Sequence, residues 1–123
     1  MAQASQGWHE RDDLLSERTQ DLHRAIVSLQ EELEAVDWYQ QRIDATRDPE
    51  LKQILAHNRD EEKEHAMMLL EWLRRHDLAF ARQHRLHVGR PGPIAVEARD
   101  EDVEEAAQVL PPPGRDATGR EGT

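Results

Sequence analysis

Two long stretches of this chain place apolar residues at alternating intervals of four and three. In the first, from about Glu10 to Asp44, the repeat runs through Leu15, Leu22, Ile26, Leu29, Leu33, Val36 and Ile43. Such spacing brings about one side chain per turn to the same face of an α-helix, and it is typical of helices that pack along a seam. We therefore predict one long amphipathic helix here.

The second stretch carries clear start and stop signals. Asp48 can cap a helix whose first residue is Pro49, a position where the missing N–H of proline costs nothing. The cations of Arg74-Arg75-His76 suit its end. Because the connector is only about residues 45–47, the fold class we predict is all-α, an antiparallel two-helix hairpin with a short C-terminal helical piece.

Composition predicts that this fold is incomplete in one copy. The chain has 123 residues, the length of one domain, of which 37% are hydrophobic and 34% are charged. That hydrophobic share is lower than in most globular domains, so one copy has too few apolar residues to complete a core.

The charge and the lack of cysteine limit the possible partners. A net charge of −10 argues against a nucleic-acid partner, and the lack of cysteine leaves only oxygen and imidazole for binding a metal. With no signal-peptide pattern and no apolar run of membrane length, we expect a soluble cytoplasmic protein that does not bind membranes.

The acidic excess is concentrated at the C-terminal end. After the Pro/Gly-rich residues 89–93, the segment 97–123 holds eight acidic residues against three arginines, so it carries half of the net charge. We divide the chain into a helical hairpin domain, residues 1–96, and this acidic segment, residues 97–123. We expect a short helix around residues 93–110 and disorder beyond about residue 110.

The seam of the second helix is polar in its middle, at Asn58, Glu62 and His65. An unpaired carboxylate in an apolar stripe would cost several kcal/mol or bind a proton, so Glu62 needs a partner. Glu62 and His65 have the Glu-x-x-His spacing, which puts a carboxylate and an imidazole on one face about a turn apart. Glu32 borders the seam of the first helix and can lean into it, which predicts a metal site.

Blander interpretations compete with this one. Polar residues in a seam can fix only register or oligomeric state, as Asn58 could. A second cluster lies on the opposite face of the first helix, and it is either an outer metal site or a solvated, partner-facing patch: Glu31, Glu34 and Trp38. His57 is the best further candidate for a second metal contact.

Counting ligands indicates how a complete site could form. Di-iron carboxylate bundles use one Glu from each of two helices and one Glu-x-x-His from each of two others. This chain supplies half of that set, so two copies paired about a two-fold axis would complete both the site and a ferritin-like four-helix bundle. Oxygen and imidazole ligands suit Fe(II), Mn(II) or Zn(II), so a di-iron centre is predicted with other divalent metals possible.

From His23 to about Arg75 the sequence resembles the encapsulated ferritins, the ferritin-like cargo of encapsulin nanocompartments. The resemblance rests on HRAIVSLQEELEAVDWYQQRIDA, DPEL and ILAHNRDEEKEHAMMLLEWLRR. It implies two-helix protomers whose dimers form a decameric ring, and a ferroxidase that oxidises Fe(II) with dioxygen while the encapsulin shell stores the mineral. The ligands it implies are Glu32, Glu62 and His65, with Glu62 bridging two irons. It further implies that Tyr39 lies beside His65 and that Glu31, Glu34 and Trp38 form an outer metal site.

One departure and three rival functions remain. The family's short docking peptide is not recognisable in GRDATGREGT, so the chain is truncated, its signal is divergent, or it works outside a compartment. The rivals are a non-catalytic helical assembly module, a metal buffer, and a peroxidase of the rubrerythrin kind. The absence of cysteine leaves no rubredoxin-like electron-transfer site for the last of these.

Overall fold

The computed structural model of this chain describes residues 7–95, and within that range it contains helices and no strand. The elements in chain order are the 3-10 turn η2 (Asp12–Leu14) and the helices α1 (Glu17–Ala45), α2 (Pro49–His76) and α3 (Leu78–His87). The all-α class is thus confirmed. The chain divides into two compact units, Met1–Glu71 and Trp72–Thr123, and each is described by itself. The helix expected around residues 93–110 and the disorder expected beyond it lie outside the described residues.

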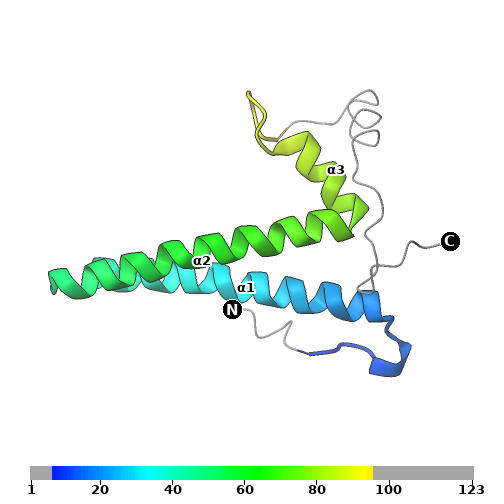
Figure 1. The fold of residues 1–123 in the computed structure, drawn as a ribbon, viewed down its shortest axis with the longest axis horizontal. Coiled ribbons are helices and arrows are strands. Elements are labelled where there is room, and N and C mark those ends of the chain that lie inside the picture. Colours follow the sequence, from blue (N-terminus) through cyan, green and yellow to red (C-terminus); the bar gives the residue numbers. More distant parts are fainter. Residues whose placement is uncertain (1–6, 96–123) are drawn as a thin grey trace. The chain divides into compact units, whose positions relative to one another are not determined.

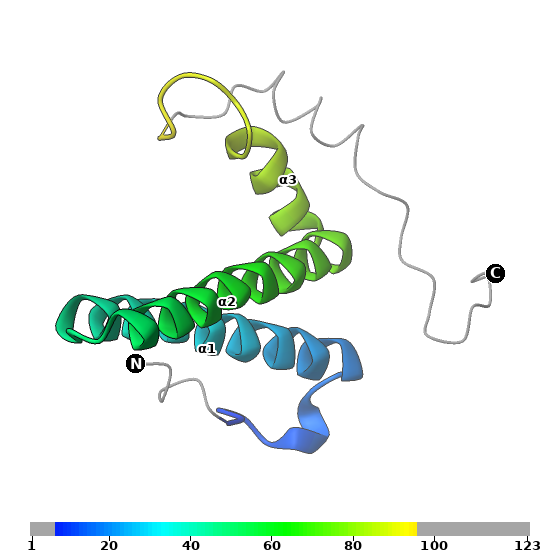
Figure 2. The ribbon, with the colours of Figure 1, turned by 60° about the vertical axis from the view of Figure 1, so that its left-hand side comes forward.

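Helices α1 and α2 lie side by side and antiparallel (Figures 1 and 2). Only residues 46–48 connect them, which forces α2 to return along α1. Arg59 on α2 ties the two helices together, because its Nη1 donates a hydrogen bond of 2.7 Å to Oε1 of Gln40 on α1. The predicted two-helix hairpin is therefore confirmed.

The two helix starts differ in how well the sequence predicted them. Oδ1 of Asp48 accepts hydrogen bonds from the backbone N–H of Glu50 at 2.9 Å and of Leu51 at 3.0 Å, so α2 begins where its capping signal placed it. The predicted start of α1 at Glu10 is wrong. Ser16 caps that helix by accepting a hydrogen bond of 3.1 Å from the N–H of Thr19, and the chain before it forms a separate 3-10 turn.

The N-terminal segment folds back onto α1. The ring of Trp8 lies 4.6 Å from the ring of His23, centroid to centroid. Nε2 of Gln20 donates to the carbonyl oxygens of Asp12 and Leu15, each at 3.3 Å. These contacts explain why residues 7–15 are not part of α1, since their polar groups and Trp8 bind to that helix from outside.

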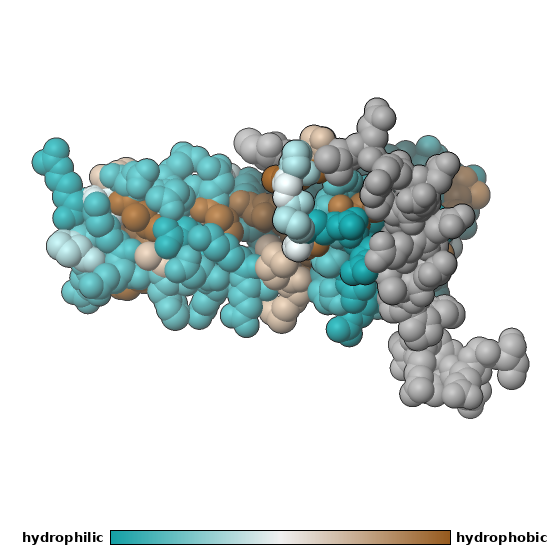
Figure 3. All heavy atoms as spheres, turned by 90° about the horizontal axis from the view of Figure 1, so that it is seen from above, coloured by the Kyte–Doolittle hydropathy of each residue, from teal (hydrophilic) through white to brown (hydrophobic). Residues whose placement is uncertain are grey.

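The hairpin has a thin core. Within residues 7–71 the buried residues are the small Ala25 and Ala66, and several large apolar side chains stay more than a third exposed: Ile26, Leu33, Trp38, Leu51, Ile54, Met67 and Met68. Figure 3 shows hydrophobic residues in a line along the long helices, bordered by hydrophilic ones. No helix among residues 7–95 combines the length and the apolar character needed to cross a bilayer. The exposed side chains agree with a core that one copy does not complete.

The connector places two polar seam residues at the same level of the hairpin. Glu32 lies 14 residues before Thr46, and Glu62 lies 14 residues after Asp48. At 1.5 Å of rise per residue, both are about 21 Å from the turn. Equal distances along antiparallel helices bring Glu32 and Glu62 opposite each other.

The second unit begins inside the last turns of α2. The ring of His76 stacks on that of Trp72, with centroids 4.1 Å apart, and its Nδ1 lies 2.8 Å from the carbonyl oxygen of Trp72. Asp77 caps α3 by accepting a hydrogen bond of 2.9 Å from the N–H of Phe80. Helix α3 is a short helical piece after the hairpin, as the predicted fold class required.

Candidate metal centre

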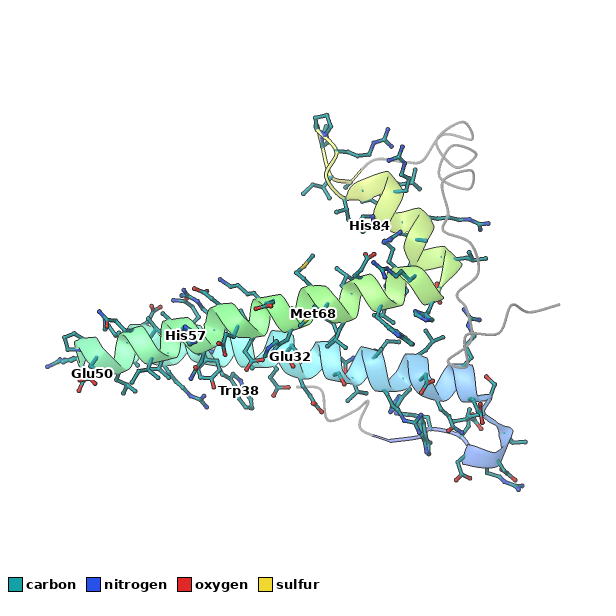
Figure 4. All side chains as sticks on the ribbon, viewed as in Figure 1. Glu32, Trp38, Glu50, His57, Met68 and His84 are labelled. Carbon is teal, nitrogen blue, oxygen red and sulfur yellow. The ribbon has the colours of Figure 1, made fainter. Side chains whose placement is uncertain are left out.

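Three side chains from the two long helices converge halfway along the hairpin. Glu62 and His65 are one turn apart on α2, and Glu32 comes from α1 at the same level. One donor atom from each lies within 4.8 Å of the other two. Figure 4 shows Glu32 midway along α1 at its boundary with α2. The structure thus brings together the three residues predicted from the seam, and no other group of this kind occurs within residues 7–95.

His65 lies against both carboxylates through a single nitrogen. Its Nδ1 is 3.5 Å from Oε2 of Glu32 and 3.4 Å from Oε2 of Glu62. The side chains of Glu32 and Glu62 are 25% and 22% exposed, whereas that of His65 is 44% exposed. The carboxylates are therefore largely withdrawn from water while the imidazole borders it. A proton on Nδ1 or a cation in this space would reduce their mutual repulsion.

The donor set fits a divalent transition metal. Two carboxylate oxygens and one imidazole nitrogen are ligands that Fe(II), Mn(II) and Zn(II) accept. To bind through Nδ1, His65 must be unprotonated at that atom, so protons compete with the metal. Three ligands leave coordination positions that water, substrate or another chain can fill.

The outer cluster predicted on α1 does not converge as Glu32, Glu62 and His65 do. Glu31 and Trp38 are exposed, Trp38 by 44%, and Glu34 is partly buried. Trp38 projects from α1 away from α2 in the view of Figure 4. Within the described part of the chain, no third His, Asp or Glu joins Glu31 and Glu34 in a three-ligand group. An outer metal site at this cluster stays a prediction.

Arg42 contacts two of the predicted site residues and was missed in the sequence. Its guanidinium carbon lies 5.9 Å from the ring centroid of Trp38 and 5.7 Å from that of Tyr39, within reach of a cation–π interaction. The spacings of three and four residues on one helix were the available signal. Tyr39 itself is partly buried on α1, and its predicted place beside His65 stays a prediction.

Charged groups on the outer face of α2 pair with one another. Nε2 of His57 lies 2.8 Å from Oε1 of Glu61, with both side chains more than half exposed. Hydrogen bonds from Arg59 and Lys63 lower the pKa of the neighbouring Asp60 carboxyl below its usual value. His57 thus has a carboxylate neighbour, and its role as a metal contact is still a prediction.

The chain matches known proteins along the hairpin and α3. Residues 7–88 match the family model described as EncFtn-like. The chain is 61% identical over 101 residues to the "Encapsulated ferritin-like protein" of Rhodospirillum rubrum, covering 81% of this chain and 72% of that one. It is 41% identical over 58 residues to the "Encapsulin nanocompartment cargo protein EncC" of Myxococcus xanthus, covering 46% of this chain and 45% of that one.

Two further matches extend the comparison. A "Ferritin-like protein" of Thermotoga maritima is 56% identical over 68 residues, which is 55% of this chain and 60% of that one. A crystal structure of a protein from Nitrosomonas europaea superposes with a TM-score of 0.70 at 59% sequence identity, covering 73% of this chain and 99% of that chain. Both the sequence and the helical arrangement of the hairpin therefore recur in other bacterial proteins.

Proposed function

This chain belongs to the EncFtn-like family, and from that premise we propose that it is a ferroxidase, which oxidises Fe(II) to Fe(III) with dioxygen. The observation that carries the proposal is the convergence of Glu32, Glu62 and His65, whose donor atoms lie within 4.8 Å of one another. Their oxygen and imidazole ligands accept iron in both oxidation states. Iron is the substrate here, and dioxygen is the electron acceptor.

The site of this ferroxidase is formed by two copies of the chain. A di-iron carboxylate bundle needs two single Glu ligands and two Glu-x-x-His pairs, and one hairpin has Glu32 and the pair Glu62–His65. A second copy related by a two-fold axis supplies the same three ligands again. The large apolar side chains that the hairpin leaves exposed support such a pairing, because a partner would cover them.

Each ligand has its own task in this arrangement. Glu62 would hold both irons, while Glu32 and His65 would each hold one of them. The two Fe(II) ions would supply one electron each to dioxygen, which takes up two protons from solvent and leaves as hydrogen peroxide. The carboxylates of Glu32 and Glu62 favour the ferric product, because harder, negatively charged oxygens stabilise the higher charge. His65 releases any proton on Nδ1 before it binds, so iron binding weakens as the solution is acidified.

Anaerobic loading with Fe(II), followed by exposure to oxygen, tests the proposal directly. We expect two Fe(II) to bind per dimer and rapid oxidation to begin only when oxygen is admitted. Glu62→Ala should abolish rapid oxidation, since it removes the bridging group. Glu50→Ala is the matched control, because Glu50 is exposed in the first turn of the same helix.

Near-normal oxidation by Glu62→Ala would contradict the assignment of the site. Iron binding without oxygen-dependent oxidation would favour a metal buffer, and weak binding without oxidation would favour an assembly module. Sizing of the metal-free and Fe(II)-loaded protein tests the shared site, since metal should promote dimerisation when each copy owns half of the ligands. A monomer at every concentration, with or without iron, would contradict sharing.

The relatives named as encapsulated or as encapsulin cargo support a compartment for this chain as well. We include in the proposal an encapsulin shell protein as partner, a decameric ring of dimers, and mineral storage by the shell. Tyr39 beside His65 and the outer cluster of Glu31, Glu34 and Trp38 belong to the same proposal. Co-expression with a shell protein, followed by isolation of intact compartments, tests the partner. A chain that stays outside the compartments would contradict it.

A further inference from the structure

The charge of this acidic chain reverses sign in its second unit. Residues 1–71 hold 17 Asp and Glu against eight Lys and Arg. Residues 72–95 hold five arginines against the single acid Asp77: Arg74, Arg75, Arg82, Arg85 and Arg90. A segment of net charge +4 thus lies within a protein of net charge −10. Such a concentration of one sign calls for an anionic partner.

This positive segment exposes both cationic and apolar side chains. Its one carboxylate, on Asp77, already caps α3 by accepting from the N–H of Phe80. Arg82, Arg85 and Arg90 are all exposed. Large apolar side chains of the segment are exposed as well: Leu78 by 57%, Phe80 by 41%, Val88 by 52% and Ile94 by 80%. A basic, apolar surface of this kind fits an acidic amphipathic segment.

The chain after α3 turns back toward that helix. Gly89 and Gly92 have positive φ angles of 70° and 90°, a conformation that other residues rarely adopt. Nδ1 of His87, in the last turn of α3, lies 3.1 Å from the carbonyl oxygen of Ile94. Residue 94 is therefore back beside the end of α3.

The sequence that follows has the complementary composition. Residues 97–110, which lie outside the described range, hold six acidic residues and one arginine, for a net charge of −5. Four apolar residues in it follow the i, i+3, i+4, i+7 spacing of a helix face: Val103, Ala106, Ala107 and Leu110. Residues 111–123 carry no net charge. The whole acidic excess of the C-terminal segment thus lies directly after the positive surface.

We propose that the acidic segment 97–110 docks onto the surface of α3 in the same chain. Its carboxylates pair with the exposed arginines, and its apolar residues cover the exposed apolar side chains of α3. The contact brings a segment of net charge −5 against a unit in which residues 72–95 carry +4. It also gives residues 97–110 a role as an intramolecular cover for α3.

Hydrogen–deuterium exchange of the full-length chain tests the docking. The variant Glu101→Arg, Glu104→Arg, Glu105→Arg reverses three charges without touching α3. We expect amides in residues 78–88 and 97–110 to exchange roughly tenfold faster in this variant, as the loss of about three surface ion pairs predicts. Asp116→Arg with Glu121→Arg is the matched control and should leave exchange unchanged.

Restoring the complementarity sharpens the test. Adding Arg82→Glu and Arg90→Glu to the triple variant should slow the exchange again, because the two introduced glutamates can then pair with the introduced arginines. Unchanged exchange in the triple variant, or no recovery on adding the α3 changes, would overturn the proposal. A general loss of helix stability would not be reversed by the second set of changes.

A disulfide distinguishes docking within one chain from exchange between two. Because the chain has no cysteine, Arg82→Cys with Glu104→Cys offers one pair to an oxidant. We expect the bond to form inside one chain in a mixture of isotopically labelled and unlabelled protein. Mixed-mass dimers as the main product would overturn docking in the same chain and assign the segment to a second copy.

Discussion

Replacing Glu62 by glutamine should stabilise the metal-free protein while removing its response to metal. The donor oxygens of Glu32 and Glu62 are no more than 4.8 Å apart, and both side chains are less than a third exposed. Two like charges at that distance repel by about 1 kcal/mol in water and by about 3.5 kcal/mol at an effective dielectric constant of 20. Because both groups keep some contact with water, we expect a gain of about 1–2 kcal/mol.

Thermal unfolding at about pH 8 is the appropriate assay. For a domain of this size, a gain of about 1–2 kcal/mol raises Tm by at least about 5 °C. The wild type should gain stability when Zn(II) or anaerobic Fe(II) is added, since metal binds the folded state. Glu62→Gln should lose most of that gain.

The control is Glu50→Gln, which changes an exposed carboxylate on the same helix. It should change the Tm of the metal-free protein by no more than about 2 °C. It should leave the rise in Tm caused by metal unchanged. A lower Tm for metal-free Glu62→Gln would refute the reasoning, because the carboxylate would then stabilise the fold without any metal. A retained metal shift would equally refute the assignment of Glu62 as a ligand.

Two further predictions concern the fold. Asp48→Ala removes the acceptor for the N–H groups of Glu50 and Leu51 and should cost about 1 kcal/mol, seen as a Tm lower by several degrees. Asp48→Asn, which keeps an oxygen there, should lose little, and equal losses would contradict the capping role. Because the hydrogen bonds from Arg59 and Lys63 lower the pKa of Asp60, its carboxylate stabilises the fold at neutral pH and loses that effect as pH falls through the lowered pKa. The Tm difference between wild type and Asp60→Asn should therefore shrink as the solution is acidified below the ordinary carboxyl pKa, and a difference that stays constant on acidification would count against this role of Asp60.

The hairpin could be predicted because its determinants are local. The cap of Asp48 and the following Pro49 act within one turn, and the structure starts α2 there. The same periodicity placed Glu62 and His65 on one face and turned Glu32 toward it. Because the short connector makes α2 return antiparallel along α1, Glu32 on α1 comes to lie beside Glu62 and His65 on α2.

Two kinds of feature were missed in the sequence: local signals hidden by a stronger pattern, and contacts between distant residues. The start of α1 at Glu17 instead of Glu10 had a local signal, the Ser16 cap, but the apolar repeat through Leu15 masked it. The tilted ring contact between Trp8 and His23 joins residues 15 apart, and no periodic pattern encodes it. The reversal of charge in residues 72–95 was hidden because the sum over residues 1–96 averaged two units of opposite sign.

The equal spacing of Glu32 and Glu62 from the turn restricts which changes in length this chain can tolerate. Both lie 14 residues from the connector. Their positions along the two helices are therefore both fixed by their distance from the turn. An added residue in the connector only lengthens a loop, at a small entropic cost. An insertion or deletion between Pro49 and Glu62 would rotate Glu62 and His65 by about 100° around α2 and carry them off the face shared with Glu32. Insertions and deletions should therefore be confined to the connector and the chain ends. The segments between Glu32 and the connector, and between the connector and Glu62, should keep their length.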